Sequence, residues 1–540
     1  MWLPLSSLRL VAVSVSLCLL LTSLAVADDF PTSVLTQTPN QLIALLKRAS
    51  DSEMIATSIE PSPSRGGIQY SVAFAKNTGG EAWVFLVNID RKRLNAANKE
   101  YANEGYENTI QCSASAGGKL YYTALWTRAK AKPVALVLPS EPIPTSGQTS
   151  AGSRPLDDMI VEFLKEHNVS GVTIAVAKDG RLVYSRGFGY ADVTALEAMQ
   201  PDAQMRIASI SKPVTSVATM MLVQQGQLTM DEPVAPLLEK AGFPKATGDE
   251  RWNKITVRHL LNHSGGWDRD VSKDPMFQVV EATKELKLRT PARQADIVRW
   301  KLGQPLDFDP GQKYAYSNFG YCILGRIVAV VSGKSYEDWV TENILAPRGM
   351  KDTRPGKTPL SDRGQTEVRY HMQQMTKHSP FWASLPVTDR GRFPKVSPLV
   401  EEPYGRWDLE VMDAHGGWVS SATDLLRFVA GLDDADAPLL SESSRQAMVS
   451  RPQLSTDQAG GGYWYGCGWS VRPRGGEKGL KGHSIWHNGA LAGTSTLLVR
   501  RWDGFSWAVL FNTDSSQNGE RLSGLIDSKM HQAIDSVSEW

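Results

Sequence analysis

In residues 155–540, apolar and polar positions alternate near both ends and follow a helical period in between. A helix is predicted at 156–163, and a hairpin at 172–184, where two β-rich runs flank the turn Lys178-Asp179-Gly180. Further strands are predicted at 464–471, 484–486, 494–499 and 506–512, after a mainly helical region from 209 to about 440. Strands from both ends around a helical middle predict an α+β fold: one antiparallel sheet with an inserted helical subdomain.

The preceding block, residues 28–137, has a different pattern and contains a weak duplication with an offset of 52. Leu42, Ala44, Lys47, Tyr70 and Lys76 are matched by Leu94, Ala96, Lys99, Tyr122 and Arg128. Each copy predicts a short helix followed by a strand pair, which in the first copy spans 70–74 and 83–87 around a turn at 77–80. We predict a small α+β module of two ~50-residue repeats, with its aromatic residues in the core and no catalytic group. Its partner is unknown.

Two further segments complete the predicted domain organisation. Residues 1–27 have the pattern of a signal peptide, with an apolar run at 10–24 and the small-residue site Ala25-Val26-Ala27. About 15 apolar residues are fewer than the ~20 that span a bilayer, so we favour cleavage after Ala27 over a membrane anchor. The expected location is secreted or periplasmic. Residues 138–154, rich in Pro, Ser, Gly and Thr, predict a linker before a catalytic domain at 155–540.

Composition adds few constraints. The chain has 540 residues, of which 41% are hydrophobic and 21% charged, as in folded proteins of two or three domains. The formal net charge is +1 and no basic tract is present, so no nucleic-acid partner is expected. After removal of the signal peptide three cysteines remain, Cys112, Cys322 and Cys467, an odd and sparse set that does not predict a disulfide scaffold.

The strongest chemical signal is Ser209-Ile210-Ser211-Lys212, at the head of an amphipathic helical run at 210–222. Residues three apart on a helix are neighbours, so the Ser209 hydroxyl and the Lys212 amine are expected on one face. A serine is a poor nucleophile until a base takes its proton, and a desolvated lysine can be that base. The alternative interpretation of this short motif is a helix-capping serine followed by a solvated lysine.

Two other segments offer complementary groups. In Tyr316-Ser317-Asn318, a tyrosine beside a lysine can have a lowered pKa and transfer protons, and an asparagine can orient substrate or hold the lysine. In His487-Asn488-Gly489-Ala490, glycine allows close approach of a backbone, and the N–H of Ala490 can pair with that of Ser209 as an oxyanion hole. Alone, each has an ordinary structural explanation as a turn or a strand end.

The order S-x-x-K, Y-x-N and [KH]-x-G resembles the serine β-lactamase and penicillin-binding protein (DD-peptidase) superfamily over roughly residues 155–530. Three collateral segments are similar to that superfamily as well: 205–208, the block ITVRHLLNHSGG at 255–266, and 416–421 with Asp424-Leu425. The resemblance implies a β-lactamase/transpeptidase-like fold and a serine hydrolase that needs no cofactor. It predicts a small peptide, amide or ester as substrate.

The resemblance also implies roles for individual residues. Ser209 would be the nucleophile that forms an acyl-enzyme, and Lys212 and Tyr316 would share the acid and base work, with the first base left open. Asn318 would orient the substrate or Lys212, while His487 and Gly489 would line the wall beside an oxyanion hole formed by the N–H groups of Ser209 and Ala490.

One position departs from the β-lactamase pattern. β-Lactamases usually have lysine where this chain has His487, and histidine is mostly neutral at pH 7. Members of the superfamily with histidine there look more like DD-peptidases, D-amino-acid peptidases and class VIII-type carboxylesterases. The resemblance therefore favours a peptidase or esterase over a β-lactamase.

Other readings of the same residues stay open from sequence alone. His259 and His263 have an i, i+4 spacing that zinc ligands can use, but no H-E-x-x-H motif and no third ligand accompany them, so no metal is predicted. His415 and Trp418 either contact substrate in the cleft or pack in the core. A non-catalytic receptor or cell-wall binding protein of the same fold is the main alternative to an enzyme, and a metallohydrolase is a weaker one.

Overall fold

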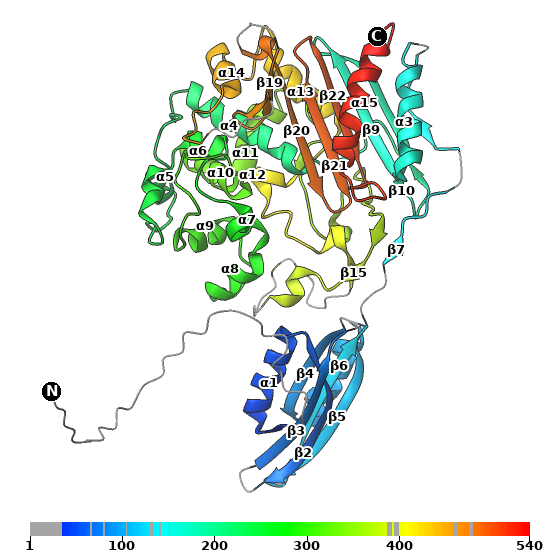
Figure 1. Ribbon diagram of the computed structural model, residues 1–540, viewed down its shortest axis with the longest axis vertical. Coiled ribbons are helices and arrows are strands. Elements are labelled where there is room, and N and C mark those ends of the chain that lie inside the picture. The colour runs from blue at the N-terminus through cyan, green and yellow to red at the C-terminus, as the bar shows by residue number, and fades with distance from the viewer. Residues whose placement is uncertain are drawn as a thin grey trace, which may run out of the picture. The chain divides into compact units, whose positions relative to one another are not determined.

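The computed structural model describes residues 35–540 except 65–66, 79–80, 104, 130–132, 140–141, 151, 386–390, 392, 394–398, 457–461 and 475–478. The predicted signal peptide lies outside these residues. The chain divides between residues 130 and 131 into two compact units, which are described separately (Figure 1). No helix among the described residues combines the length and the apolar character that a membrane span needs.

The first unit consists of two copies of one β-α-β-β arrangement. The first copy is β1 (Leu35–Gln37), α1 (Pro39–Asp51), β2 (Met54–Ser64) and β3 (Gly67–Lys76). The second is β4 (Ala82–Ile89), α2 (Arg91–Asn103), β5 (Glu107–Ala116) and β6 (Lys119–Arg128), so the helices are 52 positions apart. Each copy forms a three-stranded antiparallel sheet, in the orders β1-β3-β2 and β4-β6-β5. Tyr70, Phe74 and Trp126 are buried in the cores of this unit.

The strand pairing in the repeat differs from the prediction. The strand at 82–89 was expected to pair with the one at 67–76, but β4 opens the second copy and pairs with β6 instead. β3 pairs with β2, which precedes it. Between β3 and β4, Asn77 makes two hydrogen bonds with the Glu81 backbone, and residues 79–80 of the predicted turn lie outside the described residues.

The second unit is built on one sheet whose strands come from both of its ends, as predicted. Its order is β11-β10-β9-β22-β21-β20-β19-β18. The N-terminal strands are β9 (Gly171–Lys178), β10 (Arg181–Asp192) and β11 (Glu197–Ala198). The C-terminal strands are β18 (Trp464–Tyr465), β19 (Ser470–Pro473), β20 (His483–Leu491), β21 (Thr494–Arg500) and β22 (Phe505–Phe511). Antiparallel pairing of β22 with β9 joins the two sets and confirms the α+β fold.

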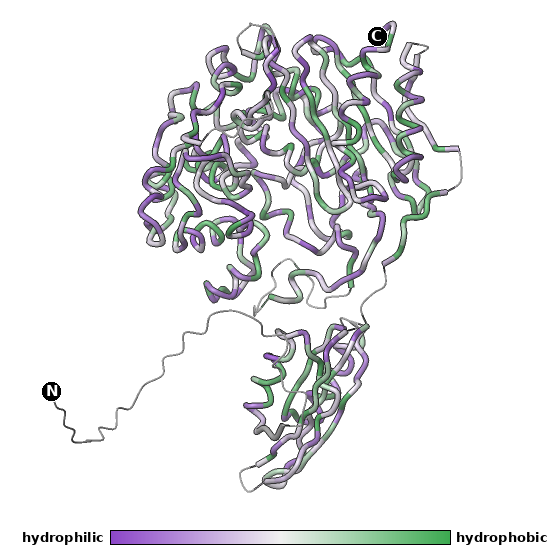
Figure 2. The backbone as a smooth tube through the Cα atoms, viewed as in Figure 1, coloured by the Kyte–Doolittle hydropathy of each residue, from purple (hydrophilic) through white to green (hydrophobic). Residues whose placement is uncertain are grey.

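Two layers of helix cover the sheet (Figure 1). On one face, α3 (Arg154–His167) and α15 (Leu522–Ser536) bury an apolar cluster against β9, β21 and β22. On the other face lies the helical region between the two strand sets, with α13 (Ala422–Asp433) against β9 and β22. The apolar positions along these strands and helices can be followed in Figure 2. Because both faces are covered, most residues of the central strands are buried.

The helical region contains the predicted inserted subdomain. Its other helices are α4 (Ser211–Gln224), α5 (Val234–Lys240), α6 (Val257–Leu261), α7 (Arg269–Ser272), α8 (Val279–Glu285), α9 (Gln294–Leu302), α10 (Asn318–Ser332), α11 (Tyr336–Val340), α12 (Asp413–Gly416) and α14 (Glu442–Val449). A small three-stranded sheet has the order β12 (Met205–Arg206), β17 (Trp418–Ser420) and β13 (Arg354–Pro355). Two-stranded pairs are β7 (Val134–Ala135) with β14 (Gln374–Met375), and β15 (Lys377–His378) with β16 (Val400–Glu401).

The segment between the predicted domains is more structured than its composition indicated. β7 at 134–135 pairs with β14 and so belongs to the second unit, not to a module that ends at 137. Within the predicted linker, β8 (Thr145–Ser146) pairs with β10. Ser146 also donates from Oγ to the main-chain oxygen of Met199 at 2.5 Å. Part of 138–154 is therefore folded onto the main sheet.

Candidate active site

Ser209 lies in a short 3-10 turn, Ala208–Ile210, directly before α4. The predicted helix thus begins one residue later than expected, at Ser211. Ala208 has φ +48°, in the left-handed region that non-glycine residues rarely adopt. Backbone strain of this kind persists only where the surroundings hold it, and it places the Ser209 side chain at the wall of a cavity.

Lys212 is fully buried beneath Ser209. Its Nζ donates to Ser209 Oγ at 3.1 Å and to the main-chain oxygen of His415 at 2.9 Å. Burial lowers the Lys212 pKa well below its ordinary value, and the negative charge of Asp274 opposes that shift. The predicted one-turn spacing therefore brings an amine with a lowered pKa against the serine oxygen.

Tyr316 completes the group around Ser209. Tyr316 lines the same cavity as Ser209, and Lys212 Nζ lies 4.7 Å from the centre of the Tyr316 ring. The sequence-based expectation was that the lysine would lower the phenol pKa. Burial instead raises the Tyr316 pKa, because the charged phenolate is the form that loses solvation. The phenol therefore keeps its proton at neutral pH.

His487 on β20 is neutral, and both of its ring nitrogens are engaged. Nδ1 lies 2.6 Å from the main-chain oxygen of Asn488, which can only accept, so Nδ1 carries the proton. Nε2 is then an acceptor and receives the hydroxyl of Tyr465 at 3.0 Å. Burial lowers the His487 pKa to about 3. The wall beside Ser209 is therefore polar but uncharged.

Gly489 allows β20 to approach the turn Ala208–Ile210, which carries Ser209. A Cβ at this position would lie 2.4 Å from the Ile207 main-chain oxygen and 2.4 Å from Thr496 Oγ1. Among the described strands, β19 pairs with β20 only as far as Ser470↔Trp486, so residues 487–491 are open on that side. Ala490 and Ser209 border the same cavity, as a two-donor oxyanion hole requires.

Asn318 begins α10, whose cap is the Ser317 hydroxyl. Its Nδ2 donates to Asp274 Oδ2 at 2.6 Å, and its buried Oδ1 has no hydrogen-bond partner among the described residues. Asp274 caps the 3-10 turn Pro275–Phe277 by accepting from Met276 N. The sequence offers no signal for Asp274 beyond that of a local cap, so its contact with Asn318 was not predicted.

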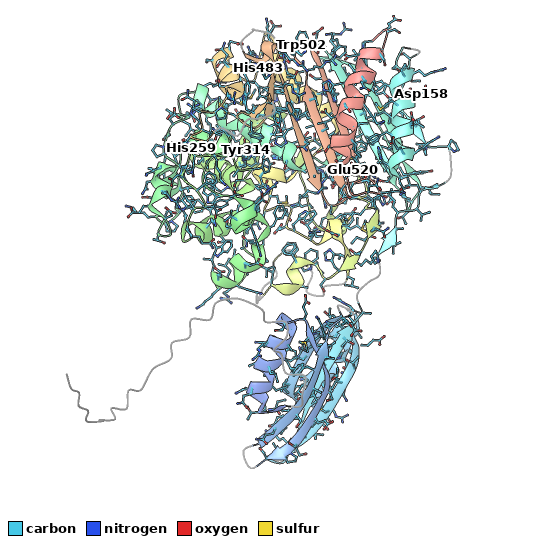
Figure 3. The ribbon with its side chains drawn as sticks, viewed as in Figure 1. Asp158, His259, Tyr314, His483, Trp502 and Glu520 are labelled. Atoms are coloured by element: carbon cyan, nitrogen blue, oxygen red, sulfur yellow. The ribbon has the colours of Figure 1, made fainter. Side chains whose placement is uncertain are left out.

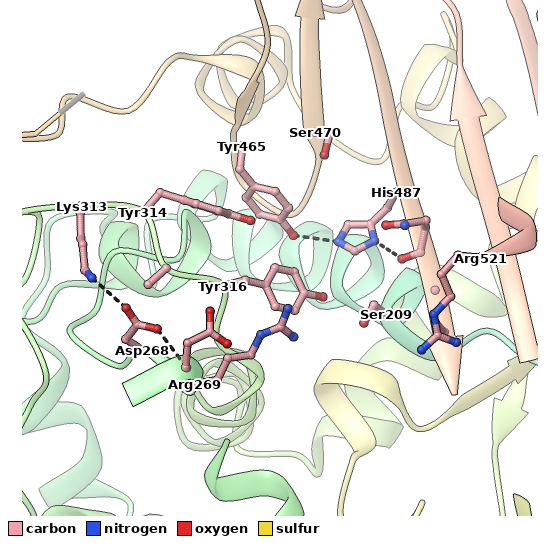
Figure 4. A pocket seen from close by; sticks show the side chains of 15 residues that line it. Ser209, Asp268, Arg269, Lys313, Tyr314, Tyr316, Tyr465, Ser470, His487 and Arg521 are labelled. Atoms are coloured by element: carbon pink, nitrogen blue, oxygen red, sulfur yellow. Dashed lines mark hydrogen bonds and ion pairs between the residues drawn. The ribbon is translucent and has the colours of Figure 1, made fainter. Parts of the chain in front are cut away.

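The cavity in front of Ser209 has a volume of about 710 Å³ (Figure 4). Tyr314, Tyr316 and Tyr465 give it an aromatic side, and Tyr314 can be found within the whole unit in Figure 3. Its charged lining residues are Asp268, Arg269, Asp270, Lys313 and Arg521. None of these five was predicted, because they come from loops and element ends that carry no periodic pattern.

The comparison with known protein families decides the identity of the second unit. The family described as Beta-lactamase matches residues 156–529, which is more than half of the chain. The chain belongs to the beta-lactamase family. That family covers the whole Ser209, Tyr316 and His487 arrangement, so the predicted resemblance is confirmed.

Individual proteins that are similar to this beta-lactamase family protein support the family assignment. Penicillin-binding protein 4* of Bacillus subtilis (strain 168) is 29% identical over 346 residues, which are 64% of this chain and 68% of that protein. An octameric penicillin-binding protein homologue from Pyrococcus abyssi superposes with a TM-score of 0.51 at 24% identity, covering 70% of this chain and 77% of that one. EstCE1, a hydrolase with promiscuous acyltransferase activity, has a TM-score of 0.52 at 20% identity over 72% of this chain and all of its own. These two structures share the fold.

Two residues predicted as possible cleft contacts of this beta-lactamase family protein lie elsewhere. The side chains of His415 and Trp418 are buried and do not border the cavity. Trp418 Nε1 donates to the Tyr336 hydroxyl at 3.2 Å inside the core. His415 contributes its main-chain oxygen, which holds Lys212. Both rings therefore pack inside the protein and do not line the cavity.

The two histidines considered as zinc ligands each accept a main-chain hydrogen bond at Nδ1. His259 Nδ1 accepts from Thr256 N at 3.2 Å, and His263 Nδ1 accepts from Ser317 N at 3.2 Å. The His263 ring packs 4.3 Å from that of Tyr316. Within the described ranges, no group of three or more His, Cys, Asp or Glu residues is arranged to hold a metal ion.

Proposed function

We propose that this chain is an exported serine hydrolase that transfers an acyl group to water through an ester on Ser209. Its substrates are small peptides or amides, including those with a D-residue, or carboxylic esters. The observation that carries the proposal is the buried Lys212 amine, 3.1 Å from the Ser209 oxygen at the wall of an open cavity. No cofactor takes part.

Lys212 is the first base in this mechanism. A base must be unprotonated at working pH, and burial lowers the pKa of Lys212 while it raises that of Tyr316. Lys212 takes the Ser209 proton as Oγ attacks the substrate carbonyl carbon. The main-chain N–H groups of Ser209 and Ala490 stabilise the oxyanion, where loss of one donor costs about 3–4 kcal/mol in comparable sites.

Tyr316 acts as the acid in the same step. Its protonated phenol, which lines the same cavity as Ser209, gives its proton to the departing amine or alkoxide as the carbonyl–leaving-group bond breaks. The proton that Lys212 accepted returns to Tyr316. In the second half, a water molecule attacks the Ser209 ester and the same groups transfer its proton, releasing the acid and restoring Ser209.

The neutral wall at His487 supports a peptidase or esterase over a β-lactamase. A fixed cation beside the nucleophile favours substrates with a carboxylate at that place, and here both nitrogens of a neutral ring are already hydrogen-bonded. A neutral ester or amide loses nothing at such a wall, whereas a carboxylate would lose solvation without gaining a charge partner.

A labelling experiment tests the nucleophile. The full chain is incubated with a fluorescent fluorophosphonate and a fluorescent penicillin, alongside Ser209→Ala and the matched control Ser211→Ala, which alters a serine two residues away. Label is expected in the wild type and in Ser211→Ala and not in Ser209→Ala. Equal labelling of Ser209→Ala would show that the proposed nucleophile is wrong. A wild type that takes no label and hydrolyses none of nitrocefin, p-nitrophenyl acetate and a D-Ala-D-Ala peptide would favour the non-catalytic receptor.

Export has its own test. If the chain is expressed in full in a bacterial host, the mature protein should be recovered from the periplasm or medium with Asp28 as its first residue. An uncleaved chain that stays in the cytoplasm would contradict this part of the proposal.

A further inference from the structure

Arg269 projects toward the cavity from the first turn of α7. Its guanidinium carbon lies 5.1 Å from the centre of the Tyr316 ring, at the edge of the site that holds Ser209 (Figure 4). The segment that carries it is fixed from below by Asp307, whose Oδ2 accepts from Asp268 N at 2.7 Å and from Ser272 Oγ at 2.8 Å. Arg269 therefore extends from an anchored base and has an aromatic face to lie on.

The Arg269 guanidinium forms no salt bridge on the part of the chain that the structure describes, although its charge acts on the nearby carboxylates of Asp268 and Asp274. No ion pair or hydrogen bond joins its guanidinium to another described residue, although it lies in a cavity with carboxylates nearby. The two other cations that line the cavity do have partners: Lys313 pairs with Asp268 at 2.7 Å, and Arg521 with Asp514 at 3.7 Å. Asp270, next in the chain, also lines the cavity but is not paired with Arg269.

The cavity is also lined by the charged residues Asp268, Asp270, Lys313 and Arg521, but the groups directly beside Ser209 carry little charge. His487 carries one ring proton, burial lowers the pKa of Lys212 well below its ordinary value, and the Tyr316 phenol stays protonated at neutral pH. The field of Arg269 reaches these groups, since it helps to lower the pKa values of Lys212 and of His263. A ligand that enters the cavity thus meets, on the lining that also contains Ser209, a guanidinium without a salt bridge to any described residue.

We propose that Arg269 is a specificity-determining residue that binds a carboxylate of the substrate, an inference that rests on the proposed serine hydrolase function. The planar guanidinium matches a carboxylate with two parallel hydrogen bonds, which a point charge does not. The Tyr316 ring beneath it restricts its orientation, so less side-chain freedom is lost on binding. The preferred substrates are acidic esters or amides, recognised from the α7 side of the cavity and not from the β20 wall.

Isosteric substrate pairs test this directly. Mono-p-nitrophenyl glutarate is compared with its terminal carboxamide, which differs only in the acyl-chain charge, and 4-acetoxybenzoate with 4-acetoxybenzamide, which differs in the charge of the leaving group. The measured quantity is kcat/KM for the acid divided by kcat/KM for the amide. The wild type should prefer the acid by about tenfold in at least one pair, as expected for hydrogen bonds to a charged group. The preference should fall with added salt.

Variants of the same segment separate contact from general charge. Arg269→Gln should bring the ratio close to one, and Arg269→Lys should keep only part of the preference because it lacks the planar fork. Asp270→Asn removes a nearby carboxylate that repels the substrate and should raise the ratio. Lys273→Gln removes a positive charge from the same loop at a residue that does not border the cavity, and should leave the ratio near the wild-type value.

The outcomes distinguish carboxylate binding by Arg269 from the proposed serine hydrolase function. A ratio near one in the wild type, or a ratio unchanged in Arg269→Gln, overturns the role of Arg269 while hydrolysis of the neutral esters still supports the enzyme. Loss of the preference in Lys273→Gln to the same extent as in Arg269→Gln also overturns it. Hydrolysis of the neutral esters that persists in Ser209→Ala contradicts the proposed function itself.

Discussion

The Asn318 side chain donates from Nδ2 to Asp274 Oδ2 at 2.6 Å. A carboxylate only accepts, so this contact fixes the amide with its nitrogen toward Asp274 and its oxygen away from it. That Oδ1 is buried without a partner among the described residues. Burial of an acceptor without a hydrogen bond costs free energy, so the contact with Asp274 has to hold the amide in this orientation. Asp274 therefore fixes the orientation of the Asn318 amide.

This relationship predicts that Asp274 and Asn318 act as a unit on amide substrates. Asp274→Asn should lower kcat/KM for a peptide substrate about tenfold, because the Asn318 amide is then free to turn over. Asn318→Ala should cost a similar amount, and the double variant little more than either. The measurement is a double-mutant cycle in kcat/KM with an expected coupling of about 1.4 kcal/mol, the cost of one tenfold loss. Additive effects would contradict a positioning role for Asp274.

The lowered pKa of Lys212 predicts a specific dependence of stability on pH. In the folded protein Lys212 is neutral above its lowered pKa, while in the unfolded chain it stays protonated up to about pH 10.4. The unfolded state therefore binds more protons in that window. This one group should make the free energy of unfolding rise with pH by at most about 1.4 kcal/mol per unit.

Lys212→Met tests that dependence by denaturant unfolding at several pH values. The variant should be inactive but more stable than wild type at pH 7, and the difference should shrink toward pH 10 as the penalty on the wild type disappears. Ser209→Ala keeps the lysine and should keep the wild-type slope. A constant difference between Lys212→Met and wild type across this range would show that Lys212 is not deprotonated by folding.

His487 is predicted to stay neutral and protonated on Nδ1 across the physiological range. Its pKa is lowered to about 3, and Tyr465 supplies a hydrogen bond to Nε2 that favours the unprotonated form of that atom. Long-range 1H–15N spectra should show one tautomer from pH 5 to 8, assigned by its loss in His487→Gln. Tyr465→Phe should raise the His487 pKa. A His487 signal that titrates near pH 6.5 in the wild type would contradict the neutral wall.

The sequence predicted those parts of the site whose spacing is local or whose strand pattern is regular. Ser209 and Lys212 are close because three residues make about one helical turn, and His487 lies at the wall because β20 alternates its side chains across the sheet. By contrast, Asp274 and Arg269 lie on a loop between short helices, where no period links a residue to a direction. Their contacts with α10 and with the Tyr316 ring depend on how separate elements pack, which local pattern does not encode.

The errors have equally specific physical causes. Trp418 belongs to a segment that matches the family. That segment forms β17, a three-residue strand between β12 and β13, and its residues are buried. For Tyr316, a neighbouring lysine was expected to lower the phenol pKa, but desolvation by burial has the larger effect and raises it. In the N-terminal unit, the alternation at 83–87 correctly predicted a strand, yet alternation does not say which strand is its neighbour.

Gly489 should tolerate no side chain, because β20 lies against the turn Ala208–Ile210 that carries Ser209. The Cβ of Gly489→Ala would lie 2.4 Å from the fixed Ile207 main-chain oxygen and 3.1 Å from Ala208 Cβ, so the strand must move away. We expect a loss of about 1–3 kcal/mol in stability from overpacking, and about a hundredfold slower acylation because Ala490 N–H leaves its place. The control is Gly524→Ala on α15, where a Cβ meets nothing within 4 Å and helix propensity should add up to about 1 kcal/mol of stability. Acylation is measured as the rate of fluorophosphonate labelling, and stability by denaturant unfolding. If Gly489→Ala labels at the wild-type rate while remaining folded, the approach of β20 to Ser209 does not set the geometry of the reaction.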